Sequence, residues 1–307
     1  MQGTIYKSTG SWYLLRDEAG NMRNARIKGK LKIDDEISST NPVAVGDVVI
    51  FEEEEKGDDV VIKTVADRRN YIIRVSPHNR NQKHIIAANI DIALVLATIA
   101  SPRTSQGFID RFLLSAEAYH IPAIIVVNKM DLHKEKHKAQ LSAWKEMYEA
   151  ANYEILTVVA KDVASINELK EKLQGKTTLF SGHSGVGKST LINQLIPGMK
   201  LKTTEVSDWS GKGQHTTTFA EMFDLPDGGK IIDTPGMKEF GLIHIEKEEL
   251  AHYFPEMRRL MHDCKFNNCV HVNEPNCAII QAMETGHLSP ERYYSYRTIL
   301  DTIETKW

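Results

Sequence analysis

The sequence predicts a multidomain chain with an N-terminal β-barrel, a doubly wound α/β domain and a helical C-terminal domain. Residues 1–68 hold only short β-type runs separated by turn signals, and no helical pattern of any length occurs there. Between residues 69 and 243, apolar strands alternate with helical patterns, which is typical of a layered α/β domain. Residues 244–307 are expected to be helical and contain all three cysteines of the chain. We therefore expect domain boundaries near residues 68 and 243.

The N-terminal region is expected to form a small barrel, with an OB-fold as one candidate. Arg26, Lys28, Lys30 and Lys32 alternate with apolar residues, so a strand would place four cations on one face. That face could follow the phosphates of an RNA, or it could simply be solvated. The expected strand regions are Ser11–Leu15, Met22–Ile33, Asp47–Glu53 and Val60–Val65.

The α/β region is expected to carry its ligand loops at the carboxyl ends of its strands. Its last two strands should form a hairpin through Pro226–Gly229. The expected strands are Ile92–Ala100, Ala123–Val127, Tyr153–Val159, Thr177–Phe180, Phe219–Leu225 and Lys230–Ile232, and the expected helices are Phe108–His120, Lys136–Ala151, Asn167–Gln174 and one beginning at Ser189.

A phosphate-binding motif follows the strand that ends at Phe180. The segment Gly182–Ser189 fits the P-loop pattern G-x-x-x-x-G-K-[ST] at every fixed position. Its backbone N–H groups would surround the phosphates, with Lys188 reaching the β- and γ-phosphates and Ser189 binding Mg²⁺. The expected GTP contacts in this loop are Gly182, His183, Ser184, Gly185, Val186, Gly187, Lys188, Ser189 and Thr190.

The segment Asn128-Lys129-Met130-Asp131 reads as the guanine-specificity motif N-K-x-D, directly after an apolar strand. The carboxylate of Asp131 can accept hydrogen bonds from N1–H and from the exocyclic amine of guanine, whereas adenine would leave it unpaired. Asn128 would hold the base edge and the P-loop, and Lys129 would pack over the ring. A second base-contacting loop is expected around Val159–Lys161, although Val159 departs from the usual serine.

The order of the motifs predicts a circular permutation. Asp233-Thr234-Pro235-Gly236 fits the D-x-x-G switch motif, with Asp233 expected to contact Mg²⁺ through water and Gly236 to meet the γ-phosphate. An ordinary G domain runs P-loop, D-x-x-G, N-K-x-D, but here N-K-x-D comes first. Met237 stands where Ras-like proteins carry a water-positioning glutamine. Another group, or a partner, must therefore orient the attacking water.

The segment His215–Thr218, between the P-loop helix and the hairpin, supplies the candidates for this role. We expect Thr217 to be the switch I ligand of Mg²⁺, with Thr216 as the alternative. His215 could orient the water, or it could be a loop histidine without a role in turnover. The expected catalytic residues are His215, Thr217 and Lys188.

The cysteines indicate a metal site near the C-terminus. Cys264, Cys269, His271 and Cys277 provide three thiolates and one imidazole, which form a closed tetrahedral set for one structural Zn²⁺. Iron or plain buried thiols are the alternatives. Zinc would fold a segment too small to hold a core of its own. Cysteines confined to one such cluster favour a reducing compartment over a disulfide framework.

Composition narrows the choice of partners. The net charge of −3 argues against a general polyanion binder, so contact with nucleic acid must come from local patches. The longest apolar run, Ile92–Ala100, is too short to cross a bilayer, and no signal peptide is expected. We expect a monomer with no membrane partner.

On these residues the chain resembles the ribosome small-subunit-dependent GTPase A family along essentially its whole length. The shared features are the N-K-x-D motif before the P-loop, Gly213–Thr217, D-x-x-G, Glu239–Gly241 and the cysteine–histidine cluster. The resemblance implies an OB-fold, a permuted G domain and a zinc domain. It also implies a bacterial cytoplasmic GTPase that binds GTP, GDP and the rRNA of the small (30S) ribosomal subunit. Its hydrolysis would be stimulated by that subunit, late in maturation.

Two other functions stay open on sequence alone. A nucleotide-gated RNA-binding switch with little turnover is favoured by Met237. An assembly factor for another ribosomal RNA particle is also possible, because no residue by itself indicates the small subunit as the partner.

Overall fold

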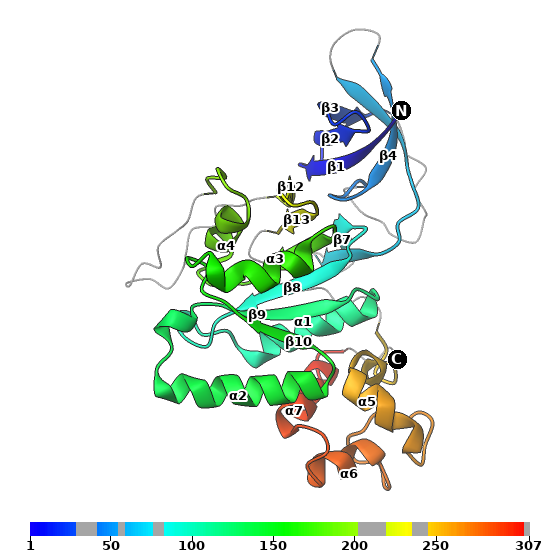
Figure 1. Ribbon diagram of the computed structural model, residues 1–307. Coiled ribbons are helices and arrows are strands. Elements are labelled where there is room, and N and C mark those ends of the chain that lie inside the picture. Colours follow the sequence, from blue (N-terminus) through cyan, green and yellow to red (C-terminus); the bar gives the residue numbers. More distant parts are fainter. Residues whose placement is uncertain (29–41, 55–58, 76–82, 202–218, 235–244, 304–307) are drawn as a thin grey trace.

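The computed structural model describes residues 1–28, 42–54, 59–75, 83–201, 219–234 and 245–303. Figure 1 shows a small barrel at one end, an α/β layer structure in the middle and a group of short helices at the other end. Among the described helices, none is long and apolar enough to cross a membrane. The three structural regions follow the order expected from the sequence, while the domain boundaries near residues 68 and 243 remain a prediction.

The N-terminal barrel is closed and has the strand order of an OB-fold. Its strands run β1-β2-β3-β5-β4, and β4 pairs back with β1. Ile5, Leu15, Phe51 and Ile62 fill its interior, each 1% exposed or less. The first strand, β1, was not among the strands expected from the sequence. The strands are β1 (Gln2–Ser8), β2 (Tyr13–Asp17), β3 (Met22–Ile27), β4 (Val48–Glu53) and β5 (Val60–Val65).

The expected cationic strand face is only partly described. The expected strand Met22–Ile33 was too long. β3 ends at Ile27, and Lys28 lies beyond its end. Arg26 is held by the carboxylate of Glu54, and Lys28 lies 3.7 Å from the same carboxylate. Lys30 and Lys32 lie outside the described residues. The phosphate-binding role of these four cations therefore stays a prediction.

The central sheet has the order β10-β9-β8-β11-β13-β12, in which only β12 is antiparallel. Alternate residues of β8 face opposite layers, because successive side chains of a strand point to opposite sides. Every expected strand of this region is present: three are three residues shorter than expected, two are one residue longer, and β9 has the expected bounds. They are β8 (Ile92–Ala97), β9 (Ala123–Val127), β10 (Glu154–Thr157), β11 (Thr177–Ser181), β12 (Glu221–Asp224) and β13 (Lys230–Asp233).

Helices cover both faces of this sheet. One layer packs α1 and α2 through residues such as Phe112 and Tyr148, and the other packs α3 and α4 through Leu169 and Ile192. This is the doubly wound arrangement expected from the alternating pattern. The helices are α1 (Gln106–Ala118), α2 (Glu135–Ala150), α3 (Asn167–Leu173) and α4 (Lys188–Leu195).

A short hairpin between the barrel and the central sheet was not expected from the sequence. Strands β6 (Tyr71–Val75) and β7 (Lys83–Ala88) pair with each other, and Ala87 also bridges to Val45 of the barrel region. Nearby, Arg68 makes two 2.7 Å bonds to the buried carboxylate of Asp47. The bridge between Ala87 and Val45 joins the barrel to the hairpin, and the pairing of β1 with β12 joins the barrel to the central sheet.

The C-terminal region is helical, as expected, and packs around Phe254, Met257 and Tyr296. Ser289 caps its last helix, since the hydroxyl of Ser289 accepts a bond from the Arg292 N–H. The helical segments are η3 (Leu250–Tyr253), α5 (Pro255–Leu260), η4 (Met261–Asp263), α6 (Ala278–Glu284) and α7 (Pro290–Leu300).

Candidate nucleotide site and metal centre

The expected nucleotide loops meet at one edge of the central sheet. β8, β9 and β10 lie on one side of β11, and β13 lies on the other, so the chain reverses its strand order between β8 and β11. Ligands of doubly wound sheets bind at such a reversal, outside the carboxyl ends of the strands. The P-loop follows β11 at this position, and the N-K-x-D segment follows β9.

Two glycines allow the P-loop to approach its neighbours closely. A side chain at Gly182 would come within 2.8 Å of the carbonyl oxygen of Leu96. Gly187 has a φ of +98°, and a Cβ there would lie 2.3 Å from the amide nitrogen of Asn128. Only glycine fits both demands at position 187, since it has no Cβ and tolerates positive φ.

Asn128 joins three loops of the site. Its Nδ2 donates to the carbonyl oxygen of Val186 at 2.8 Å, and its Oδ1 accepts from the N–H of Ala160 at 2.9 Å. The side chain is 2% exposed, so these bonds are shielded from water. The expected base loop around Val159–Lys161 therefore lies next to the N-K-x-D segment, although a contact of that loop with a base stays a prediction.

Lys129 and Asp131 are oriented by the turn that follows β9. Lys129 takes a left-handed backbone conformation with a φ of +63°, and its Nζ donates to the carbonyl oxygen of Ser101 at 2.6 Å. Burial lowers the pKa of the Lys129 ammonium, and nearby Lys161 acts in the same direction. Asp131 lies in the short helical turn Met130–Leu132 and is exposed, so its carboxylate is accessible to a base.

Lys188 and Asp233 face each other at the mouth of the P-loop. The Nζ of Lys188 lies 2.5 Å from the carboxylate of Asp233 and also contacts the carbonyl oxygen of Thr234. Asp233 is 1% exposed and comes from the end of β13, whereas Lys188 begins α4. A hydroxyl on Ser189 and a carboxylate on Asp233 are oxygen ligands of the kind that Mg²⁺ prefers, so these residues fit that ion.

Other expected site residues lie outside the described part of the chain. They are His215, Thr216, Thr217, Gly236 and Met237. Their roles in water orientation, Mg²⁺ binding and γ-phosphate contact remain predictions.

A loop that was not expected from the sequence contacts the P-loop through Thr104. Thr104, in the segment between β8 and α1, lies 2.6 Å from Nε2 of His183 through its hydroxyl oxygen. The same oxygen accepts the N–H of Thr98 at 2.8 Å. No local motif marks Thr104, because the contact joins residues 79 positions apart.

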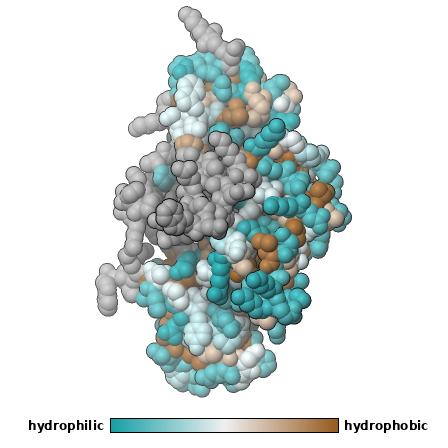
Figure 2. Space-filling model, turned by 90° about the vertical axis from the view of Figure 1, so that its left-hand side faces the viewer, coloured by the Kyte–Doolittle hydropathy of each residue, from teal (hydrophilic) through white to brown (hydrophobic). Residues whose placement is uncertain are grey.

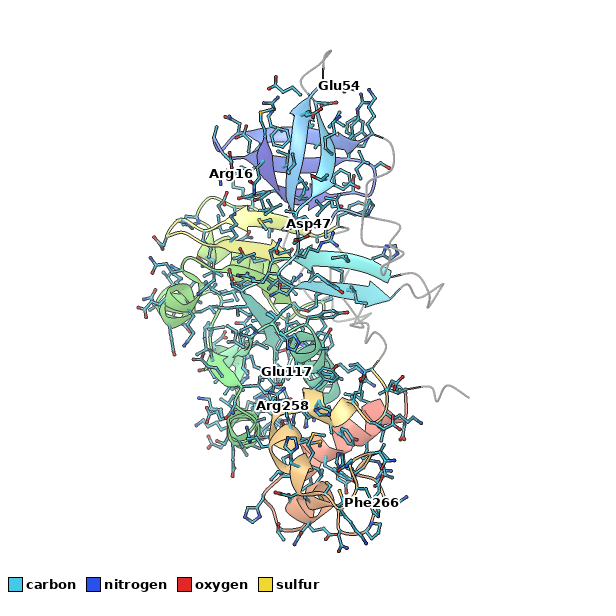
Figure 3. The ribbon with its side chains drawn as sticks, turned by 90° about the vertical axis from the view of Figure 1, so that its right-hand side faces the viewer. Arg16, Asp47, Glu54, Glu117, Arg258 and Phe266 are labelled. Carbon is cyan, nitrogen blue, oxygen red and sulfur yellow. The ribbon has the colours of Figure 1, made fainter. Side chains whose placement is uncertain are left out.

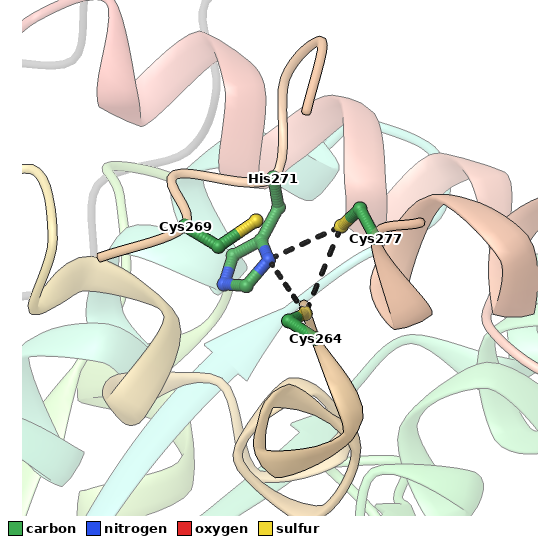
Figure 4. Close-up of side chains that lie close together, drawn as sticks. All are labelled: Cys264, Cys269, His271 and Cys277. Atoms are coloured by element: carbon green, nitrogen blue, oxygen red, sulfur yellow. Dashed lines mark hydrogen bonds between the residues drawn. The ribbon is translucent and has the colours of Figure 1, made fainter. Parts of the chain in front are cut away.

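The cysteine–histidine cluster converges as the sequence predicts. The four ligand atoms of Cys264, Cys269, His271 and Cys277 all lie within 4.8 Å of one another. In Figure 4 the imidazole turns its Nδ1 toward the sulfurs, at 3.3 Å from Cys277 and 3.6 Å from Cys264. Three sulfurs and one nitrogen in a buried cluster fit a tetrahedral Zn²⁺ bound through Nδ1.

The loop that carries this cluster is held by its neighbours. Burial alone would raise the pKa of the Glu274 carboxyl, but hydrogen bonds from backbone N–H groups, including those of Val272 and Val270, lower it. The hydroxyls of Tyr293 and Tyr296 donate to the backbone carbonyls of His271 and Val270, both at 2.8 Å. The ligand loop is thus fixed onto α7, which supports a structural role for the metal.

Charged side chains join the C-terminal helices to α1. At the surface, Arg258 pairs with Glu117 at 3.1 Å, and Figure 3 shows the two residues facing each other across this seam. Within it, Arg292 of α7 bonds Asp110 of α1 at 2.6 Å and Glu256 of α5 at 2.6 Å. Burial would lower the pKa of Arg292, but the two carboxylates raise it. The guanidinium therefore stays charged inside the protein.

Taken together, the barrel, the permuted order of the nucleotide loops and the cysteine–histidine cluster define a circularly permuted GTPase with two appended domains. Residues 65–243 match the RsgA GTPase family, and residues 2–62 match the RsgA N-terminal domain. The chain belongs to the RsgA GTPase family and hydrolyses GTP.

Relatives and solved structures of this type align along nearly the whole chain. A protein of Christiangramia forsetii named small ribosomal subunit biogenesis GTPase RsgA is 48% identical over 100% of this chain and 98% of its own length. The structure of YjeQ from Thermotoga maritima has a TM-score of 0.77 and 32% identity, covering 98% of this chain and 97% of that one. YloQ, described as a circularly permuted GTPase, has a TM-score of 0.73 and 28% identity, covering 100% and 96%.

Proposed function

We propose that this protein is a cytoplasmic GTPase of ribosome biogenesis that binds the small ribosomal subunit and its rRNA. Binding of the subunit stimulates its hydrolysis of GTP late in maturation. The observation that carries the proposal is the full-length match to relatives named for small-subunit biogenesis, with barrel, G domain and cysteine cluster all present. A monomer suits this role, since both appended domains lie on one chain.

The nucleotide pocket supports the chemistry of this proposal. A water oxygen attacks the γ-phosphorus, and the bond to the bridging oxygen of the leaving GDP breaks. Lys188 would stabilise the charge on the β- and γ-phosphates, while Asp131 selects guanine. His215 is our candidate for orienting the water, with Thr217 as a further ligand of Mg²⁺. Magnesium would be held by Ser189 and, through water, by Asp233, and it would neutralise charge on the phosphates.

The surface suits contact with RNA through local features, because the chain as a whole is slightly acidic. On the face shown in Figure 2, hydrophobic side chains of the described residues form small, separate patches among hydrophilic ones. We propose that Arg26, Lys28, Lys30 and Lys32 of the barrel contribute phosphate contacts. The ion pairs of Glu54 with Arg26 and Lys28 would exchange for phosphate in the complex.

The decisive experiment compares steady-state GTP hydrolysis by the free protein, with purified small subunits and with purified large subunits. We expect strong stimulation by small subunits alone. Stimulation by large subunits instead would assign the protein to another particle. Equal rates in all three samples would reject subunit-stimulated hydrolysis.

A further inference from the structure

A chain of polar contacts connects the C-terminal domain with helix α1. Arg292 is 2% exposed and bonds Oδ1 of Asp110, which is 0% exposed. The hydroxyl of Ser295, three residues later on α7, donates to Oδ2 of the same carboxylate. The hydroxyl of Tyr148 on α2 donates to Oδ1 at 3.0 Å. Because a buried carboxylate is costly without its partners, Asp110 holds α1 and α7 in one relative position.

Helix α1 connects Asp110 with the residues at the N-terminal end of the helix. Gln106, one turn before Asp110, donates from Nε2 to Oδ2 at 3.3 Å. Ser105 caps the helix by accepting the N–H of Phe108 at 3.3 Å. Since the helix is hydrogen-bonded throughout and packed into the core, a displacement at Asp110 also displaces the residues just before the cap.

The residue before the cap is Thr104, which is 1% exposed and contacts the phosphate loop. The Nδ1 of His183 lies 3.2 Å from the carbonyl oxygen of Ser184, which can only accept, so Nδ1 carries the proton. Burial lowers the pKa of His183, which keeps the ring neutral. Its Nε2 therefore accepts the hydroxyl proton of Thr104. The ring of Phe108 meets the imidazole edge-on at a centroid distance of 5.7 Å.

We propose that Thr104 is a positioning residue for the phosphate loop, and that the C-terminal domain sets its place through Arg292, Asp110 and α1. His183 stands second in the P-loop, so its hydrogen bond fixes the backbone that surrounds the phosphates. This route acts through α1 and does not need the segment after Asp233. It acts without any ribosomal particle, so its test is independent of the function proposed above.

The first test compares Thr104→Val with Thr104→Ser in the full-length, zinc-loaded protein. Valine keeps the shape but removes the hydroxyl, which bonds both His183 and the N–H of Thr98, whereas serine keeps this hydroxyl. Loss of these two hydrogen bonds should weaken GDP affinity about fivefold in the valine variant, and serine should stay within about twofold of the unchanged protein. Thermal unfolding and zinc content are measured on the same samples. A merely structural role would lower Tm in the valine variant and leave its GDP affinity unchanged, which would overturn the proposal.

The second test places a change in the other domain, with a matched control on the same helix. Ser295→Ala removes the α7 hydroxyl that bonds Asp110, while Thr298→Ala removes an exposed hydroxyl that bonds only the carbonyl of Tyr294 on its own helix. We expect Ser295→Ala to weaken GDP affinity about threefold and Thr298→Ala to have no effect, because only the first touches the carboxylate on α1. GTP kcat and KM are measured in parallel.

A double variant decides whether the two sites communicate. Distant residues with no shared partner normally act independently, within about twofold. We expect Ser295→Ala to have no further effect on GDP affinity once Thr104→Val is present. An equal loss in both backgrounds, or a Ser295→Ala protein indistinguishable from the Thr298→Ala control, would overturn the route through α1.

Discussion

The amide of Asn128 donates to the carbonyl oxygen of Val186, 58 residues further along the chain, at 2.8 Å. This bond links the N-K-x-D segment to the P-loop, so the segment expected to bind the base and the loop expected to bind the phosphates share one side chain. In a permuted chain the two motifs sit on strands that are joined in an unusual order. The Asn128 bond shows that the two motifs lie side by side although the chain reaches them in permuted order.

Gly187→Ala should abolish this link. The new Cβ would lie 2.3 Å from the Asn128 amide, and the φ of +98° would strain any side chain. We expect a loss of affinity for both GTP and GDP of at least about tenfold, because phosphate and base loops are displaced together. Titration with a fluorescent GDP analogue measures the affinity, with Gly198→Ala as a control that also has a positive φ but whose Cβ would meet no atom within 4 Å. Retained affinity in Gly187→Ala would contradict the shared role of Asn128.

Asp131→Asn should change the choice of base. An amide in place of the exposed carboxylate cannot accept both guanine donors, but it suits the altered edge of xanthine. We expect GTP affinity to fall and xanthosine triphosphate to be preferred in a competition titration. A mutant that still prefers GTP would show that another group selects the base.

Lys188→Ala and His215→Ala should affect different steps, GTP binding and GTP hydrolysis. The first removes the cation at the phosphates and should abolish GTP binding. The second should keep GTP affinity and lose hydrolysis stimulated by the small subunit, because a water-orienting group acts only in the transition state. Steady-state kcat and KM separate the two effects. An unchanged kcat in His215→Ala would remove histidine from the mechanism.

Cys269→Ala should affect partner response more than nucleotide binding. Loss of one thiolate weakens the zinc site and loosens the loop fixed onto α7, whereas most of the P-loop contacts lie within the α/β domain. We expect lost zinc, strongly reduced subunit stimulation and a far smaller loss of GTP affinity. Metal analysis and hydrolysis assays on the same preparation measure this. Full stimulation after complete zinc loss would show that the cluster is dispensable.

Neutralising Lys28, Lys30 and Lys32 together should weaken subunit binding and reduce its dependence on salt. Each lost phosphate contact should lower the slope of log affinity against log salt by up to about 0.7–0.9. Lys63, which pairs with Glu52 on the barrel, is the matched control. An unchanged slope would show that these lysines make no phosphate contacts and are simply solvated.

The sequence by itself determined the parts that depend on local spacing. Short motifs with a defined chemistry could be recognised directly: the P-loop, N-K-x-D, D-x-x-G and the metal cluster. The order of the first three predicted the permutation. The alternation of strands and helices could also be predicted, because apolar runs and helical spacing are local features of the sequence. β1 and the β6–β7 hairpin were missed. Besides its local partner β2, β1 pairs with the distant strands β4 and β12, and the hairpin bridges to Val45 of the barrel region, so part of their stability comes from contacts that no local pattern shows.

Only the tertiary structure decided which distant side chains meet. Thr104 and Arg292 belong to no motif, and their partners His183 and Asp110 lie 79 and 182 residues away. The sequence pattern of α1 gives its apolar face, but it does not show that Asp110 on this helix is buried against a cation from the last helix. Burial makes the contact between Asp110 and Arg292 important for stability, because a charge removed from water is costly unless it is paired within the folded chain.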